Sequence, residues 1–170
     1  MKSLALATAL LLSPWAAPGR PAEAVAELKD ASGAPVGTVR FVQAPRGLLV
    51  IGEVRGLSPG PHGLHVHEVG KCEPPFQSAG GHFNPTGKKH GFLSSSGMHA
   101  GDLPNIVVPA SGGLQFELFA PDLTLEPGKP GYLLDADGSA LLVHSGPDDY
   151  RSDPAGGSGD RVACGVVSKL

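Results

Sequence analysis

Aromatic side chains are scarce in this sequence: Phe, Tyr and Trp together make up 5% of its 170 residues. Long basic runs are lacking too, because none exceeds the pair Lys88-Lys89, and the formal net charge is −3. This charge pattern gives no reason to expect a nucleic-acid partner. The main apolar stretch, from Leu4 to Leu12, is far shorter than the about 20 residues of a membrane-spanning helix. Glycine (25 residues) and proline (17 residues) are abundant instead, which argues against long helices.

The N-terminal segment has the features of a secretory signal peptide. A short basic start, Met1-Lys2, precedes the apolar stretch, and an Ala-x-Ala cleavage motif follows at Ala22-Glu23-Ala24. We therefore predict a signal peptide at residues 1–24, cleavage after Ala24, and one mature domain at residues 25–170 in the periplasm or outside the cell. An uncleaved membrane anchor is the alternative. After cleavage, no membrane association is expected.

The chain contains two cysteines, Cys72 and Cys164. In an exported protein an even number of cysteines favours a disulfide, and two free, buried thiols are the alternative. The 146 residues that follow the predicted cleavage suffice for one buried core and leave little room for a second domain.

Short apolar segments predict an all-β fold. Seven are expected to be strands: Val25 to Leu28, Thr38 to Val42, Leu48 to Val54, Leu64 to Glu68, Leu114 to Phe119, Ala140 to His144 and Ala163 to Val167. Short strands with turns between them indicate an antiparallel sandwich or barrel. Two long connections, residues 69–101 and 145–160, interrupt this pattern. Because loops of this length are usually functional or disordered, and the first carries three histidines and a cysteine, a functional role is favoured there.

Histidines are concentrated in one part of the chain, since five of the seven lie between His62 and His90. His65 and His67 are one residue apart on a predicted strand. Strand side chains alternate between faces, so these two imidazoles project from the same side, while Leu64 and Val66 face the other way. Taken alone, such a pair is a weak sign of a metal site.

The histidines of the long loops strengthen that sign. His82, His90, His99 and Asp102 supply three imidazoles and one carboxylate, which can close a tetrahedral zinc site of the structural type. His144 ends an apolar strand and could join His65 and His67 in a nitrogen site that suits copper.

Four segments resemble the motifs of copper,zinc superoxide dismutases: Gly63-Leu-His-Val-His-Glu68, Gly80-Gly-His-Phe-Asn-Pro85, His99-Ala-Gly-Asp-Leu103 and Arg161-Val-Ala-Cys-Gly165. The resemblance covers nearly the whole mature chain, and the gaps from His67 through His82, His90 and His99 to Asp102 are similar to those of the family. It implies a Greek-key antiparallel β-barrel or sandwich with two long functional loops. It also implies that the chain converts two superoxide anions into dioxygen and hydrogen peroxide.

The resemblance also implies a role for each site residue. The implied copper ligands are His65, His67, His82 and His144, and the implied zinc ligands are His82, His90, His99 and Asp102. His82 would thus bridge both metals as an imidazolate and would exchange a proton during the reaction.

The remaining implied residues lie around the metals. Asp148 would link a copper ligand to a zinc ligand, and Arg161 would guide superoxide to copper, since a guanidinium offers a fixed charge and a donor fork to a small anion. Cys72 and Cys164 would form the intrasubunit disulfide of the family. His62 is not expected to be a ligand, because its spacing from His65 is wrong for the same strand face.

The chain also departs from the eukaryotic members. The short spacing from His67 to Cys72 and the short second loop resemble the exported bacterial type, and the usual acidic and lysine steering cluster is missing. Candidate steering residues are Lys71, Lys88, Lys89 and Arg151.

Other readings are weaker. The first is a non-enzymatic copper/zinc-binding or chaperone-like module, against which the Arg161 side chain argues, because storage does not need it. A copper-only dismutase would lack the zinc ligands, and a β-sandwich adhesion domain would carry these histidines only by accident. The resemblance allows a homodimer, although the sequence does not fix the oligomeric state.

Overall fold

Apolar residues at every second position build the first strand of this protein. In this strand, β1 (Glu23–Asp30), Ala24, Ala26 and Leu28 are buried while Glu27 and Lys29 are exposed. The computed structural model describes residues 19–170. The strands within this range are β1 (Glu23–Asp30), β2 (Pro35–Ala44), β3 (Gly47–Arg55), β4 (Gly60–His67), β5 (Asp102–Val108), β6 (Gly113–Ala120), β7 (Ala140–His144) and β8 (Arg161–Lys169).

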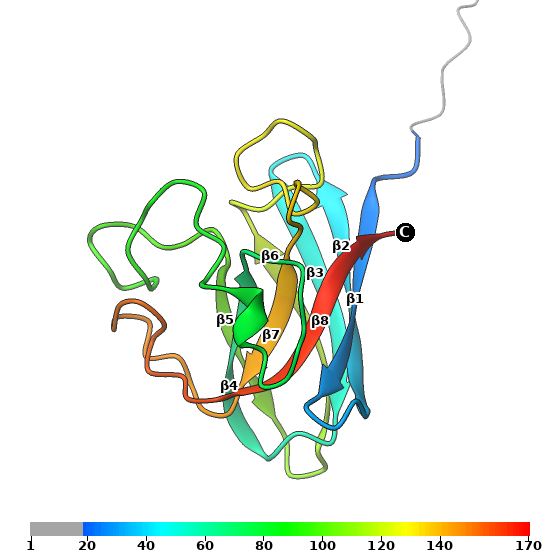
Figure 1. Cartoon of the computed structure of the whole chain (residues 1–170), viewed down its shortest axis with the longest axis vertical. Coiled ribbons are helices and arrows are strands. Elements are labelled where there is room, and N and C mark those ends of the chain that lie inside the picture. Colours follow the sequence, from blue (N-terminus) through cyan, green and yellow to red (C-terminus); the bar gives the residue numbers. More distant parts are fainter. Residues whose placement is uncertain (1–18) are drawn as a thin grey trace, which may run out of the picture.

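The eight strands form one antiparallel sheet in the order β5-β4-β7-β8-β1-β2-β3-β6 (Figure 1). Its two outer strands, β5 and β6, approach each other, so the sheet curls into a nearly closed barrel. Pairing of β4 with β7 and of β8 with β1 requires long connections between strands distant in sequence, as in Greek-key folds. The predicted fold class is confirmed. The barrel interior holds one apolar core that includes Phe41, Leu48 and Leu141.

Each of the seven predicted strands is present, with ends that differ by a few residues. Glu68 lies just outside β4, and β5 was not predicted. Strand β5 begins Asp102-Leu-Pro-Asn, and Asp, Pro and Asn are all rare in strands. It lies at an edge of the sheet, where proline is tolerated.

The N-terminal end of β1 bears on the predicted signal peptide, most of which lies outside the described residues. Strand β1 starts at Glu23, two residues before the predicted mature chain, and Ala24 is fully buried and opposite Phe41. Within residues 19–170, no helix is long and apolar enough to cross a membrane.

The two predicted long loops connect β4 to β5 and β7 to β8, and they lie on the same side of the barrel (Figure 1). The first contains a short 3-10 helix, Gln77–Ala79. A disulfide between Cys72 and Cys164 ties this loop to β8, with a Cα–Cα distance of 5.7 Å, so the predicted disulfide is confirmed.

Candidate metal centre

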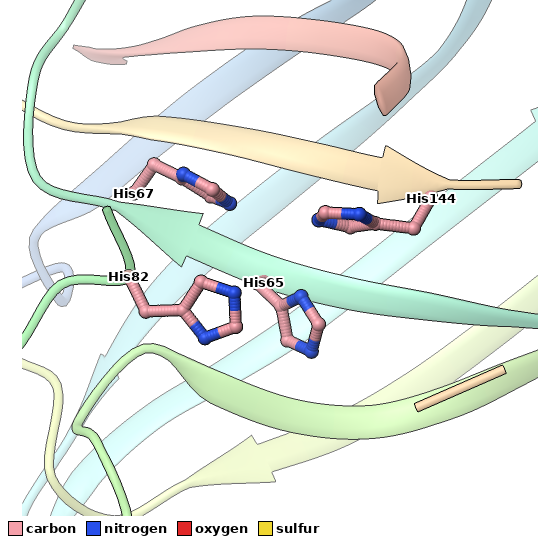
Figure 2. A group of neighbouring side chains, drawn as sticks. All are labelled: His65, His67, His82 and His144. Atoms are coloured by element: carbon pink, nitrogen blue, oxygen red, sulfur yellow. The ribbon is translucent and has the colours of Figure 1, made fainter. Parts of the chain in front are cut away.

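Four histidines gather beside the pair of strands β4 and β7. His65 and His67 alternate along β4, His144 is the last residue of the neighbouring β7, and His82 comes from the first long loop. An isolated β-bridge between His67 and His82 fixes the loop against the end of β4. Figure 2 shows the four rings pointing toward a common space. We call these residues the four-histidine cluster.

One ring nitrogen of each of these histidines is buried without a hydrogen-bond partner. These atoms are His65 Nδ1, His67 Nε2, His82 Nε2 and His144 Nε2. The four ligand atoms lie within 4.8 Å of one another. Buried polar atoms in proteins normally have partners, so four converging nitrogens without a partner indicate a cation-binding site. A set of imidazole nitrogens suits copper.

The other ring nitrogens of the cluster are held by the protein. His67 Nδ1 donates to the carbonyl of Gly80 at 3.0 Å, and His65 Nε2 donates to the Asp148 carboxylate at 2.9 Å. These hydrogen bonds select the tautomer in which the orphaned nitrogen keeps its lone pair. The loops, through the Gly80 carbonyl and the Asp148 carboxylate, thereby orient the rings before any metal binds.

A second cluster shares His82 with the first. It contains His82, His90, His99 and Asp102, all buried, with ligand atoms within 4.8 Å of one another. Asp102 Oδ1 lies 2.8, 3.1 and 3.2 Å from the Nδ1 atoms of His82, His90 and His99 respectively. We call this set the aspartate cluster. Three imidazoles and one carboxylate converging on one point fit a closed four-coordinate zinc site.

The backbone around Asp102 holds its carboxylate in place. Asp102 Oδ2 accepts hydrogen bonds from the backbone N–H groups of Gly91 and His99, at 2.9 and 3.1 Å. Since Asp102 is the first residue of β5, the sheet supports one ligand of the cluster, while His82, His90 and His99 lie on the loop.

Burial keeps three histidines of the four-histidine cluster neutral. It lowers the pKa of His67 to about 2 and that of His144 to about 3, and nearby imidazoles add to both shifts. Burial also lowers the pKa of His82 to about 4, although the Asp102 carboxylate opposes this shift. These rings are therefore unprotonated near neutral pH, as metal binding requires.

In the aspartate cluster, the carboxylates of Asp102 and Asp148 outweigh the effect of burial on the pKa values. Burial alone would lower the pKa of His90, but Asp102 and Asp148 outweigh it and raise this pKa to about 9. Burial would likewise raise the pKa of both carboxyl groups, yet hydrogen bonds from the histidines hold each pKa well below its ordinary value. Both carboxylates therefore stay ionised at neutral pH.

Asp148 connects the two clusters. Its Oδ2 accepts a hydrogen bond from His65 Nε2 at 2.9 Å, and its Oδ1 lies 3.0 Å from His90 Nε2. Its side chain is fully buried. A carboxylate in this position fixes the orientation of one ring in each cluster, as the sequence-based hypothesis requires.

Arg161 lies beside the four-histidine cluster at the start of β8. Its guanidinium donates to the backbone carbonyls of Phe76 and Gly80, both at 2.7 Å. The Gly80 carbonyl is the same one that holds His67. Partial burial lowers the pKa of Arg161 below its ordinary value.

The remaining candidates lie apart from the clusters. His62 is buried with Nδ1 2.6 Å from the carbonyl of His144 and Nε2 2.8 Å from the carbonyl of Ser58, and it belongs to neither ligand set. Among the proposed steering residues, Lys89 forms an ion pair with Asp153, and Lys71, Lys88 and Arg151 are exposed.

Sequence reasoning missed Gly80 and Asn105. Gly80 has a φ of 74° and presents its carbonyl to both His67 and Arg161, and Asn105 binds the backbone of Asp148. The Gly80-Gly81 pair was a signal for a special backbone conformation, but no local pattern marked Asn105.

Known proteins are similar to this chain in sequence and in the arrangement of the strands. The family model described as copper/zinc superoxide dismutase matches residues 36–167. A Cu-Zn superoxide dismutase of Aquifex aeolicus is 46% identical over 147 residues, which cover 85% of this chain and 86% of that protein. The Cu-Zn superoxide dismutase of Caulobacter vibrioides is 44% identical, over 85% of this chain and 84% of that protein. The crystal structure of a SOD-like protein from Bacillus subtilis has a TM-score of 0.81 at 41% identity, covering 84% of this chain and 96% of that one.

Proposed function

The chain belongs to the copper/zinc superoxide dismutase family, and we propose that each of its two clusters would hold one metal and that His82 would be a ligand in both. It is a superoxide dismutase, which disproportionates superoxide into dioxygen and hydrogen peroxide. In this proposal the four-histidine cluster holds copper and the aspartate cluster holds zinc.

One observation carries this division of the ligands. The two nitrogens of His82 face different clusters: Nδ1 lies 2.8 Å from Asp102 Oδ1, and Nε2 is one of the four orphaned atoms beside β4. A ring with both nitrogens directed at ligand sets is suited to an imidazolate between two cations, because the cations stabilise its negative charge. Copper, when bound, exchanges electrons with superoxide, and zinc supplies charge that holds the bridging ring.

The protein residues around the clusters then have separate tasks. Asp148 fixes the rings of His65 and His90, and Gly80 fixes His67. Arg161 offers a positive charge next to the four-histidine cluster, where it can attract a small anion. A metal store does not need such a charge, so Arg161 supports an enzyme over a storage or chaperone-like module.

Metal analysis of the purified protein by mass spectrometry tests the assignment. We expect one copper and one zinc per chain, with a visible copper absorbance. Zinc alone after copper loading, with no visible copper band, would mean that His65, His67 and His144 are not copper ligands. The homodimer that the resemblance allows stays a prediction, which sedimentation velocity on the same sample measures.

We also propose that the chain is exported, and the disulfide supports this because such bonds persist in oxidising compartments. Cleavage after Ala24 would remove the first two residues of β1, including a fully buried side chain. Cleavage after Gly19 satisfies the small-x-small rule with Ala17 and leaves β1 whole. The mass of the mature protein distinguishes an N-terminal Arg20 from an N-terminal Val25.

A further inference from the structure

The side chain of Asn105, on edge strand β5, forms two hydrogen bonds with the backbone of Asp148. Asn105 Oδ1 accepts a hydrogen bond from the N–H of Asp148 at 2.9 Å, and Asn105 Nδ2 donates to the carbonyl of Asp148 at 2.9 Å. The amide thus pairs with both polar backbone groups of one residue, as a neighbouring strand would. Among residues 19–170, no other residue binds both groups, and the second long loop has no strand of its own at this point.

A third hydrogen bond connects Asn105 to Tyr150. The backbone N–H of Asn105 donates to the Tyr150 hydroxyl at 2.8 Å, and the N–H of Tyr150 donates to Asp148 Oδ1 at 2.6 Å. Tyr150 has a φ of 61°, a conformation that non-glycine residues rarely adopt. Its ring packs against Phe92, with ring centroids 5.3 Å apart. Asn105 therefore holds the segment from Asp148 to Tyr150 at both of its ends.

Besides the N–H of Tyr150, the Asp148 carboxylate contacts one ring of each cluster. With the Asp148 backbone fixed, its two oxygens meet His65 Nε2 and His90 Nε2, one from each cluster. Loss of the Asn105 amide would leave the backbone N–H and carbonyl of Asp148 without partners and free this part of the loop to move. Metal affinity depends on how well such outer partners orient the ligands.

We propose that Asn105 is a positioning residue for the metal centre, acting through Asp148 to set the orientation of His90. This inference rests on the proposed division of the ligands between copper and zinc. His90 is the more sensitive of the two rings, because it lies on a long loop whereas β4 and its neighbours already hold His65. The zinc side should therefore respond more than the copper side.

Zinc affinity of the Asn105→Ala variant tests the proposal by competition with a chromophoric chelator. We expect an approximately 10-fold weaker zinc affinity, at the lower end of the roughly 10–100-fold effect of outer-partner changes. Asn84→Ala is the matched control. The Asn84 amide also binds one backbone at both groups, that of Lys88 at 2.9 Å each, but Lys88 carries no carboxylate toward the metals. Its zinc affinity should change far less.

A double-mutant cycle separates positioning from general destabilisation. If Asn105 acts through Asp148, adding Asn105→Ala to Asp148→Ala should lower the zinc affinity little further than Asp148→Ala alone. Cobalt(II) bound in the aspartate cluster gives a second readout, since its visible bands report ligand geometry, and these should shift in Asn105→Ala but not in Asn84→Ala. If Asn105→Ala fails to fold, Asn105→Asp serves instead, because it keeps the acceptor for the Asp148 N–H and should lie between wild type and Asp148→Ala.

Two results would overturn the proposal. One is unchanged zinc affinity in the Asn105 variants. The other is a loss of zinc affinity on Asn105 substitution that is equally large in the wild-type and the Asp148→Ala background. Asp102→Ala is measured in parallel. If Asp102→Ala leaves zinc binding intact, the proposed ligand division itself fails. If Asp102→Ala abolishes zinc binding and the Asn105 variants do not weaken it, only the positioning role fails.

Discussion

Replacing Asp102 by alanine should weaken zinc binding far more than copper binding. Asp102 is the only carboxylate in the aspartate cluster, and its Oδ1 faces the Nδ1 atoms of three histidines. Removing it opens a closed four-coordinate site. We expect the zinc affinity to fall by more than the roughly 10–100-fold that loss of an outer partner costs. The four-histidine cluster keeps all its ligands.

The same substitution should destabilise the protein even without metal. Asp102 Oδ2 accepts the backbone N–H groups of Gly91 and His99, and its side chain is fully buried. Two buried donors left without an acceptor cost about 1–3 kcal/mol each, so the free energy of unfolding should fall by about 2–6 kcal/mol. Asp102→Asn keeps an oxygen for these donors, so it should recover much of this stability while zinc binding stays weak.

Chelator competition titrations for each metal, with urea unfolding of the metal-free protein, measure both effects. Asp153→Ala is the control, because that exposed carboxylate also binds the zinc-side loop, at the N–H of His90, but faces no ligand nitrogen. It should leave both affinities nearly unchanged. Equal losses of copper and zinc in Asp102→Ala would show that the division of ligands is wrong.

Three further predictions follow from the same contacts. Arg161→Glu should cut activity strongly at unchanged copper and zinc contents, because electrostatic focusing, described for superoxide dismutases generally, raises association rates by roughly 10–10³. Arg161→Lys should lose less activity, since the positive charge remains. Full activity of metallated Arg161→Glu in a superoxide-consumption assay would refute the guiding role. Replacing both cysteines by serine should lower the free energy of unfolding in urea by roughly 4–5 kcal/mol, because the disulfide spans 92 residues; a loss under about 1 kcal/mol would contradict this. Gly156→Ala should lower zinc affinity about tenfold, since a Cβ there would clash with both Asp148 Oδ1 and His90 Nε2. Gly157→Ala, with a similar φ and open space, should not; equal zinc affinities of the two variants would count against the contact between Asp148 and His90 as a support of the zinc side.

Much of the fold followed from the sequence because strand patterns are local. Alternating burial along β1 follows from its own adjacent residues, and each of the seven predicted strands is present. Strand β5 was missed because Asp102, Pro104 and Asn105 oppose strand formation locally. Pairing with β4 supplies hydrogen bonds that outweigh these preferences, and pairing is a property of the tertiary structure.

The sequence alone also determined which side chains could bind metal. The spacing of His65 and His67 put both rings on one face, and the disulfide had no alternative partner because the chain has two cysteines. The full ligand sets and the disulfide rested in addition on the resemblance to copper,zinc superoxide dismutases.

The tertiary structure decided which ring nitrogen of each histidine in the four-histidine cluster is free to bind a metal. Hydrogen bonds to Gly80 and Asp148 leave Nε2 free on His67 but Nδ1 free on His65, although both residues lie on the same strand. It also brought Asn105 to the backbone of Asp148, 43 residues away in sequence. Such contacts join segments that are distant along the chain, so no local pattern of residues encodes them, and only folding of the barrel brings their polar groups within hydrogen-bonding distance.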